Sequence, residues 1–226
     1  MSTLITEDGK VASGVKLEPE KLENLFAPRQ VEAFVPPPTG IDNLGITSTD
    51  NFHVPGKGDF SVDFKGYVRV ARSTPTHGDW VNAVVYTNLI EMKMVGHADG
   101  LGEVLVTLNP DYLSTGQLRT PFEDMCEAQP EKACRMAVGA LFEVPALGIT
   151  LFNKEPIELT IDNVKKIPPA GNPGLGRIYR MLPLFDYDDP NGPPTAYLTA
   201  LKFAMGTYLT ERELEAFRCL GSGRTQ

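Results

Sequence analysis

The sequence contains few of the residues that metal binding, redox chemistry and nucleophilic catalysis usually require. Its 226 residues include three cysteines, three histidines and one tryptophan. No two cysteines have C-x-x-C spacing, and no cysteine or histidine pair has the spacing of a zinc finger. No serine or cysteine stands in a nucleophile-elbow context, and no glycine-rich stretch completes a dinucleotide fingerprint. We therefore predict no metal, no cofactor and no catalytic residue.

Long apolar runs and an excess of positive charge are also missing. Residues 1–14 are acidic and polar, where a signal peptide needs a basic start and an apolar run. Nothing elsewhere approaches the roughly 20 apolar residues of a membrane-spanning helix. The chain has 29 acidic and 21 basic residues, a net charge of -8, and a diffuse negative charge repels phosphate groups. We expect a soluble, cytoplasmic protein that binds neither nucleic acid nor membranes.

Two of the cysteines, Cys126 and Cys134, flank a polar stretch. They could close a small disulfide loop in an oxidising compartment. Because the sequence has no export signal, we expect both to remain thiols in a reducing cytosol.

Residues 60–70 alternate between apolar and polar side chains almost without interruption. Since side chains of a strand point to opposite faces with period two, this run predicts a strand with one buried and one exposed face. A second extended run, from Trp80 to His97, exceeds the usual strand of about 3–10 residues, so we expect a bulge or bend near Asn88. Residues 103–108 add a third run after a glycine-containing turn. Together they predict a three-stranded antiparallel meander.

The rest of the chain contains shorter β-type runs separated by turn residues, a pattern typical of a sandwich. One local signal marks a helix: residues 210–213, Thr-Glu-Arg-Glu, form a capping box, which predicts a helix start at Glu211. Pro19, within an acidic stretch, predicts a short N-terminal helix. We therefore expect an all-β protein, with an N-terminal extension carrying a short helix (1–40) and a single antiparallel β-sandwich domain ending in a short helix (41–226). The further strands are expected at 135–144, 147–152, 157–164, 177–185 and 197–209.

Two motifs resemble metal sites but fit them poorly. The pairs His77-Gly78-Asp79 and His97-Ala98-Asp99 repeat a His-x-Asp pattern. An extended run between them, at ~3.3 Å per residue, places the two pairs at opposite ends of the sheet. Residues 186–192, Asp-Tyr-Asp-Asp-Pro-Asn-Gly, resemble a calcium loop but lack the ligand, glycine and closing glutamate of an EF-hand. We interpret both motifs as turns, and a weak irregular calcium site at 186–192 stays open.

Five residues are candidates for a ligand-binding site. Met92 and Met94 share a strand face, and their flexible thioether side chains can adapt to a ligand or partner, although such residues also fill ordinary cores. Trp80 opens the same run, where it anchors the core or lines a pocket mouth. His77 and Asp79 come directly before it.

Three short phrases resemble an uncharacterised bacterial family of similar length. They are Leu151-Phe152-Asn153-Lys154-Glu155-Pro156-Ile157, Ile167-Pro168-Pro169 and Tyr197-Leu198-Thr199. The resemblance spans most of the chain after residue 40. Because that family has no assigned activity, the resemblance implies a bacterial origin and no particular function.

The sequence leaves two classes of function open. We favour a non-catalytic binding or interaction module that acts through loops or an exposed sheet edge, since no catalytic motif is present. The alternative is a carrier, or an enzyme of isomerase or cyclase type, whose apolar cavity holds a hydrophobic small molecule. The partner is thus either an unidentified protein or an apolar small molecule, and the sequence is also compatible with a homo-oligomer. A solid core would favour the first class, and a cavity of a few hundred cubic ångströms the second.

Overall fold

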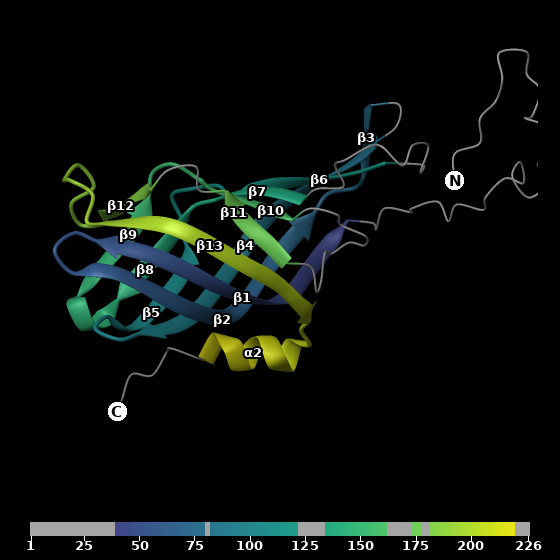
Figure 1. The fold of residues 1–226 in the computed structure, drawn as a ribbon. Helices are drawn as coiled ribbons and strands as arrows, with labels where there is room; N and C mark the ends of the chain where they lie inside the picture. Colours follow the sequence, from purple (N-terminus) through teal and green to yellow (C-terminus); the bar gives the residue numbers. More distant parts are fainter. Residues whose placement is uncertain (1–38, 80–81, 122–133, 162–172, 178–180, 220–226) are drawn as a thin grey trace, which may run out of the picture. The chain divides into compact units, whose positions relative to one another are not determined.

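Strands make up most of the chain that the structure describes. A computed structural model describes residues 39–79, 82–121, 134–161, 173–177 and 181–219, all within one compact unit of residues 34–226 (Figure 1). Every strand pairing in it is antiparallel, and an α-helix lies near the C-terminus. The predicted all-β antiparallel class is therefore confirmed. The helix expected near Pro19 lies outside the described residues.

The predicted three-stranded meander is present as β2 (Gly58–Arg72), β4 (Asn82–Ala98) and β5 (Gly102–Leu108), which pair in that order. Strand β1 (Gly40–Val54), which was not predicted, pairs with β2. Gly100 and Gly102 have positive φ angles in the turn between β4 and β5, a conformation that residues with a side chain rarely adopt. The bulge expected near Asn88 is present. Arg69 pairs with Glu91 and Val70 with Leu89, so Ile90 is the extra residue on β4.

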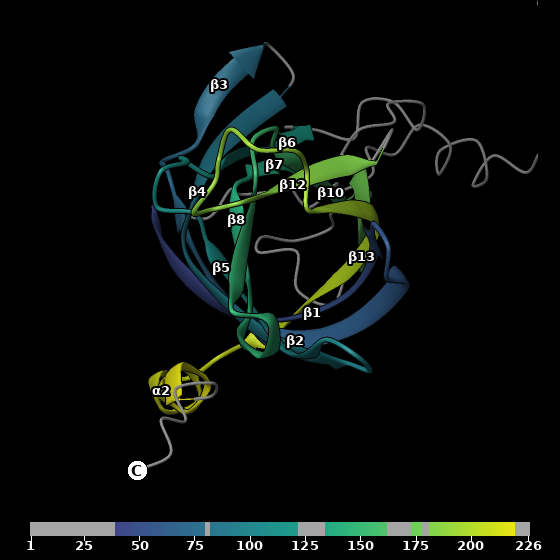
Figure 2. The ribbon, with the colours of Figure 1, turned by 90° about the vertical axis from the view of Figure 1, so that its left-hand side faces the viewer.

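The sheet closes on itself. Its strand order is β1-β2-β4-β5-β8-β9-β12-β13-β11-β10-β7-β6, and β1 also pairs with β13 while β4 pairs with β6. Figure 2 looks into the resulting ring. The two layers expected of a sandwich are thus opposite walls of one wrapped sheet. The remaining strands are β3 (Thr76–Asp79), β6 (Thr115–Pro121), β7 (Cys134–Val138), β8 (Ala140–Val144), β9 (Ile149–Asn153), β10 (Ile157–Ile161), β11 (Pro173–Arg177), β12 (Leu182–Asp186) and β13 (Ala196–Tyr208), with a 3-10 turn, η1, at Pro145–Leu147.

The prediction of a single strand at residues 135–144 is wrong, because the segment divides into two strands at Gly139. β7 pairs with β6 and β10, whereas β8 pairs with β5 and β9. The Gly139 N–H donates to Ser114 Oγ at 3.1 Å, and its carbonyl accepts from the Asn109 N–H at 3.0 Å. A side chain at this position would meet the Tyr112 ring at 2.5 Å. The loop that contains Asn109 and Ser114 therefore takes the hydrogen bonds of Gly139 that would otherwise continue a single strand.

Inward-facing side chains fill the core as the alternation predicted. On β2 the expected buried face consists of Phe60, Val62, Phe64, Val68 and Val70; Phe60 is half-buried and the other four are buried. Tyr67 belongs to the opposite face, which we expected to be exposed, yet it is 2% exposed because the C-terminal helix covers it.

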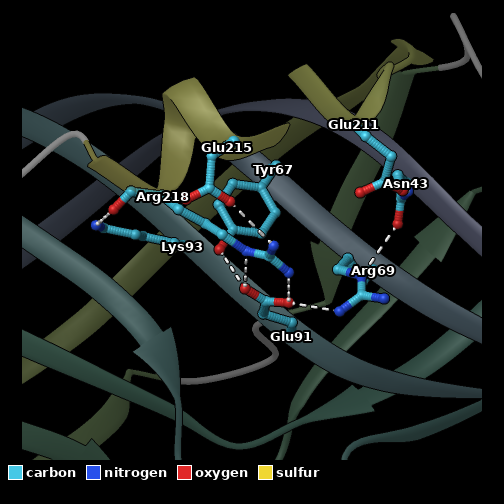
Figure 3. A network of polar contacts seen from close by, with 8 residues as sticks. All are labelled: Asn43, Tyr67, Arg69, Glu91, Lys93, Glu211, Glu215 and Arg218. Atoms are coloured by element: carbon cyan, nitrogen blue, oxygen red, sulfur yellow. Dashed lines mark hydrogen bonds and ion pairs between the residues drawn. The ribbon is translucent and has the colours of Figure 1, made fainter. Parts of the chain in front are cut away.

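Helix α2 (Glu211–Cys219) lies against the outer face of β2 and β4 (Figure 3). Its capping box is confirmed: the Glu213 N–H donates to Thr210 Oγ1 at 3.3 Å, and the Thr210 N–H donates to Glu213 Oε2 at 2.8 Å. Farther along the helix, Arg218 donates to both carboxylate oxygens of Glu91, at 3.0 and 2.9 Å. Tyr67 donates to the same carboxylate, so α2 is fixed to the sheet by one charged cluster.

Candidate functional site

The closed sheet contains three cavities that follow one another along its interior. The outer cavity has a volume of about 850 Å³, the middle cavity about 30 Å³ and the inner cavity about 40 Å³. Leu159 lines both the outer and the middle cavity, and Phe142 lines both the middle and the inner one. The three spaces are thus adjacent segments of one interior, separated by individual side chains.

A row of paired residues from five neighbouring strands forms the floor of the outer cavity. The row runs Arg72, Thr87, Gly116, Met136 and Leu159, from β2 through β4, β6 and β7 to β10. Paired residues on adjacent strands share a face, so the row presents a continuous surface. At Gly116 a Cβ atom would lie 2.5 Å from a backbone oxygen of β7 and 2.8 Å from Thr87 Oγ1. Glycine therefore allows β7 and the Thr87 side chain to pack closely here.

Most of the residues that line the outer cavity are polar or charged. The Arg72 guanidinium is held by Asp42, with Nε–Oδ2 and Nη2–Oδ1 distances of 2.5 and 3.0 Å. Within the described residues, the buried atoms Thr87 Oγ1 and Asn88 Oδ1 have no hydrogen-bond partner. Leaving a buried acceptor unsatisfied costs about 1–3 kcal/mol. A ligand donor in this cavity would remove that cost.

The middle cavity is apolar except on one side. Met92 and Met94 from β4 line it together with aliphatic and aromatic side chains of β1, β5, β7, β8, β10 and β13. Its polar side consists of Ser48 and Asp50, which occupy inward-facing positions of β1 between Ile46 and Phe52.

The carboxyl group of Asp50 is the most unusual group in the interior. Asp50 is 1% exposed, and among the described residues its side-chain hydrogen-bond partner is Ser48. Ser48 Oγ also lies 3.1 Å from the Lys202 carbonyl oxygen of β13. Burial in apolar surroundings disfavours the charged carboxylate and raises the pKa of Asp50 to about 7, while the hydrogen bond from Ser48 opposes this effect. Asp50 can therefore hold or release a proton near neutral pH.

The inner cavity closes this interior with apolar groups. Phe52 and Phe142 meet edge to face, with ring centroids 5.6 Å apart. Leu147 of η1 and Ile149 of β9 are further lining residues. The interior thus changes from a polar-rimmed outer cavity to an inner end lined by apolar residues and Thr195.

The structure brings together two of the five predicted site residues. Met92 and Met94 both line the middle cavity. His77 and Asp79 lie on β3, and Trp80 lies outside the described residues. Sequence reasoning missed Ser48, Asp50 and Asn88. The available signal for the first two was a pair of polar residues at inward positions of β1, between the apolar residues Ile46 and Phe52.

The two motifs that resemble metal sites occupy separate places. Continuous β4 separates the pair His77 and Asp79 from the pair His97 and Asp99, as expected from the sequence. Residues 186–192 form a turn, in which the Gly192 N–H donates to the Asp189 carbonyl at 3.1 Å. Across the described residues, no three His, Cys, Asp or Glu side chains gather closely enough to hold a metal ion. Nor does any described helix have the length and apolar character needed to cross a membrane.

Comparisons with known proteins place the chain in a family without an assigned activity. It belongs to the family of unknown function DUF6073, whose model matches residues 2–215. The solved structure of DynF from the dynemicin biosynthesis pathway of Micromonospora chersina is 57% identical to it, with a TM-score of 0.73, over 88% of this chain and 95% of that chain. No curated protein matches.

Proposed function

We propose that this protein binds a small, largely apolar organic molecule inside its closed sheet and serves as a non-catalytic binding or carrier protein. The observation that carries the proposal is the series of three cavities, open and polar-rimmed at one end and apolar at the other. Ligand sites are typically concave, about 300–1,000 Å³ in volume, and mostly apolar with a few fixed polar groups. The outer cavity, at about 850 Å³, has this size, and the two smaller cavities beyond it supply the apolar surface.

The pairing of the strands favours an internal site over recognition through a sheet edge. Both ends of the strand path are paired, β1 with β13 and β6 with β4. Among the described strands, the short β3 alone lies off this closed path. A partner that adds a strand needs a free edge, and the closed sheet provides little of one.

The similarity to DynF supports a role in a biosynthetic pathway. DynF comes from the dynemicin biosynthesis pathway, and the two chains align over most of their lengths at 57% identity. We infer that the ligand of this protein is a substrate, an intermediate or a product of a pathway that makes a small organic molecule.

Displacement of a fluorescent dye tests the proposal. Anilinonaphthalene sulfonate reports apolar sites by its emission, and decanol should displace it from the purified protein. Leu159→Ala joins the outer and middle cavities, so decanol should bind more tightly. Each additional buried methylene contributes about 0.8 kcal/mol, or roughly fourfold in affinity.

Leu113→Ala provides the matched control, because Leu113 is 72% exposed and does not line any of the three cavities. The affinity of the Leu113→Ala variant for decanol should equal that of the unmodified protein. Equal affinities in all three proteins, or no saturable binding in any of them, would contradict an internal apolar site.

A further inference from the structure

The carboxyl group of Asp50 has no evident structural purpose. Its neighbours on the inward face of β1, Ile46 and Phe52, fill the same interior with apolar side chains. A buried ionised carboxyl costs several kcal/mol unless it is paired. The described residues that line the middle cavity with Asp50 carry no positive charge and no second titratable group. An apolar residue would therefore suit the fold better than Asp50 does.

The hydrogen bonds of Ser48 leave one oxygen of Asp50 available. The Lys202 carbonyl can only accept, and the single Ser48 hydroxyl proton can be donated either to that carbonyl or to Asp50 Oδ1. When Asp50 is protonated, its O–H can donate to Ser48 while Ser48 donates to Lys202. When Asp50 is ionised, Ser48 donates to it instead. In both states Oδ2 has no partner among the described residues, and Asp50 lines the middle cavity.

We propose that Asp50 and Ser48 recognise a hydroxyl group within the otherwise apolar ligand. This inference rests on the proposed function, and it specifies the class of ligand: an apolar molecule with a neutral hydrogen-bond donor that reaches the middle cavity. The volume of that cavity, about 30 Å³, is the space of one water molecule in the liquid and so admits a group the size of a hydroxyl. The apolar body would occupy the outer cavity, of about 850 Å³, on the other side of Leu159.

A hydroxyl fits this position better than an ammonium group. An ammonium has three donors and a full charge, and it needs several acceptors to compensate for lost hydration. The polar groups described at the middle cavity are Asp50 and Ser48 alone. A hydroxyl needs one acceptor for its proton, which Asp50 Oδ2 can provide.

Two isomeric probes isolate the donor. Decanol and methyl nonyl ether have the same atoms and similar shapes, but only decanol can donate a hydrogen bond. Affinities are measured by displacement of anilinonaphthalene sulfonate and checked by calorimetry. A hydrogen bond to a charged group contributes about 1.5–3 kcal/mol, so at pH 8, where Asp50 is ionised, decanol should bind the unmodified protein roughly tenfold to a hundredfold more tightly than the ether.

Asp50→Val should abolish this preference. Valine suits a buried strand position, so the ether should bind as before while the ratio of the two affinities falls to about one. Asp63→Val is the matched control, because Asp63 lies on the exposed face of β2, and it should keep the ratio of the unmodified protein. If Asp50→Val does not fold, Asp50→Asn replaces it. The ratio should then rise with pH through neutrality in the unmodified protein and stay constant in Asp50→Asn.

The outcomes separate this inference from the proposed function. If both probes bind the unmodified protein equally, the hydroxyl is not recognised and the inference fails, whereas the internal apolar site stands. If the preference for decanol persists in Asp50→Val, another residue accepts the hydrogen bond and the inference also fails. If neither probe binds saturably, the proposed function fails together with the inference.

Discussion

Replacing Asp50 with asparagine should stabilise the protein at neutral and alkaline pH. Asparagine has nearly the same shape as aspartic acid, and its amide can donate to Ser48 Oγ as the protonated carboxyl can. The variant keeps the hydrogen bond but cannot ionise. It thus removes the cost of a charge inside the apolar middle cavity without creating a new space.

The magnitude follows from the pKa of Asp50. Burial raises this pKa from 3.8 to about 7, so between these values the folded protein holds a proton that the unfolded chain releases. Stability falls with rising pH wherever the folded state binds more protons. The free energy of unfolding should therefore decrease between about pH 4 and pH 7 and then level off. A shift of about three pKa units corresponds to roughly 4 kcal/mol, an upper estimate for a buried group that can relax.

Urea denaturation at pH 4, 6 and 8 tests this prediction. Asp50→Asn should match the unmodified protein to within about 1 kcal/mol at pH 4 and exceed it by up to roughly 4 kcal/mol at pH 8. Asp63→Asn, on the exposed face of β2, serves as the control and should show no such divergence. Parallel stability curves for the unmodified protein and Asp50→Asn would show that Asp50 titrates normally, and the assignment of a neutral buried carboxyl would then be wrong.

Three further predictions concern the framework around the site. Phe64→Ala should lower the free energy of unfolding by about 3–5 kcal/mol, because Phe64 is 1% exposed; a loss below about 1 kcal/mol in urea would contradict its place in the core. Thr210→Ala should cost about 0.5–2 kcal/mol and speed hydrogen exchange in residues 211–219, with unchanged exchange in the central strands. Glu91→Gln should cost about 1–3 kcal/mol at pH 7 and loosen α2 in the same exchange experiment. Hydrogen bonds from Arg218 are the main reason that the pKa of Glu91 is lowered to about 2. The stability that ionised Glu91 contributes is therefore present above pH 4.5 and is lost as the pH falls towards 2. The glutamine variant should lack that acid-dependent loss of stability.

Elements with strong local signals could be predicted from the sequence. The meander of β2, β4 and β5 follows from two-residue alternation and a glycine turn, and the start of α2 follows from a capping box within four residues. The bulge on β4 followed from strand length alone. Each of these features is determined by residues close together in the sequence, so the local sequence pattern is sufficient to predict it.

Features decided by distant contacts could not be predicted. The division at Gly139 depends on Ser114 and Asn109, which come from a loop more than twenty residues away. β11 lies in a proline- and glycine-rich segment just before the strand expected at 177–185, and its pairing with β10 and β13 makes it a strand. Closure of the sheet through β1 and β13 likewise joins the two ends of the domain. Burial of Tyr67 depends on α2, which covers the face of β2 that the alternation of residues 60–70 predicts to be exposed (Figure 3).

The failure to recognise β1 and the failure to recognise the site have the same cause. Ser48 and Asp50 occupy inward positions of β1, where a structural strand would carry two more apolar residues, and so they interrupt the alternation that identifies a strand. Sequence patterns predict structure where every residue serves packing, and they weaken where residues serve a ligand. A polar residue that breaks the pattern of a strand, and that the structure then places in an apolar cavity, is therefore positive evidence for a binding site. Asp50 satisfies both conditions, whereas Met92 and Met94 keep the pattern and so remain compatible with ordinary packing.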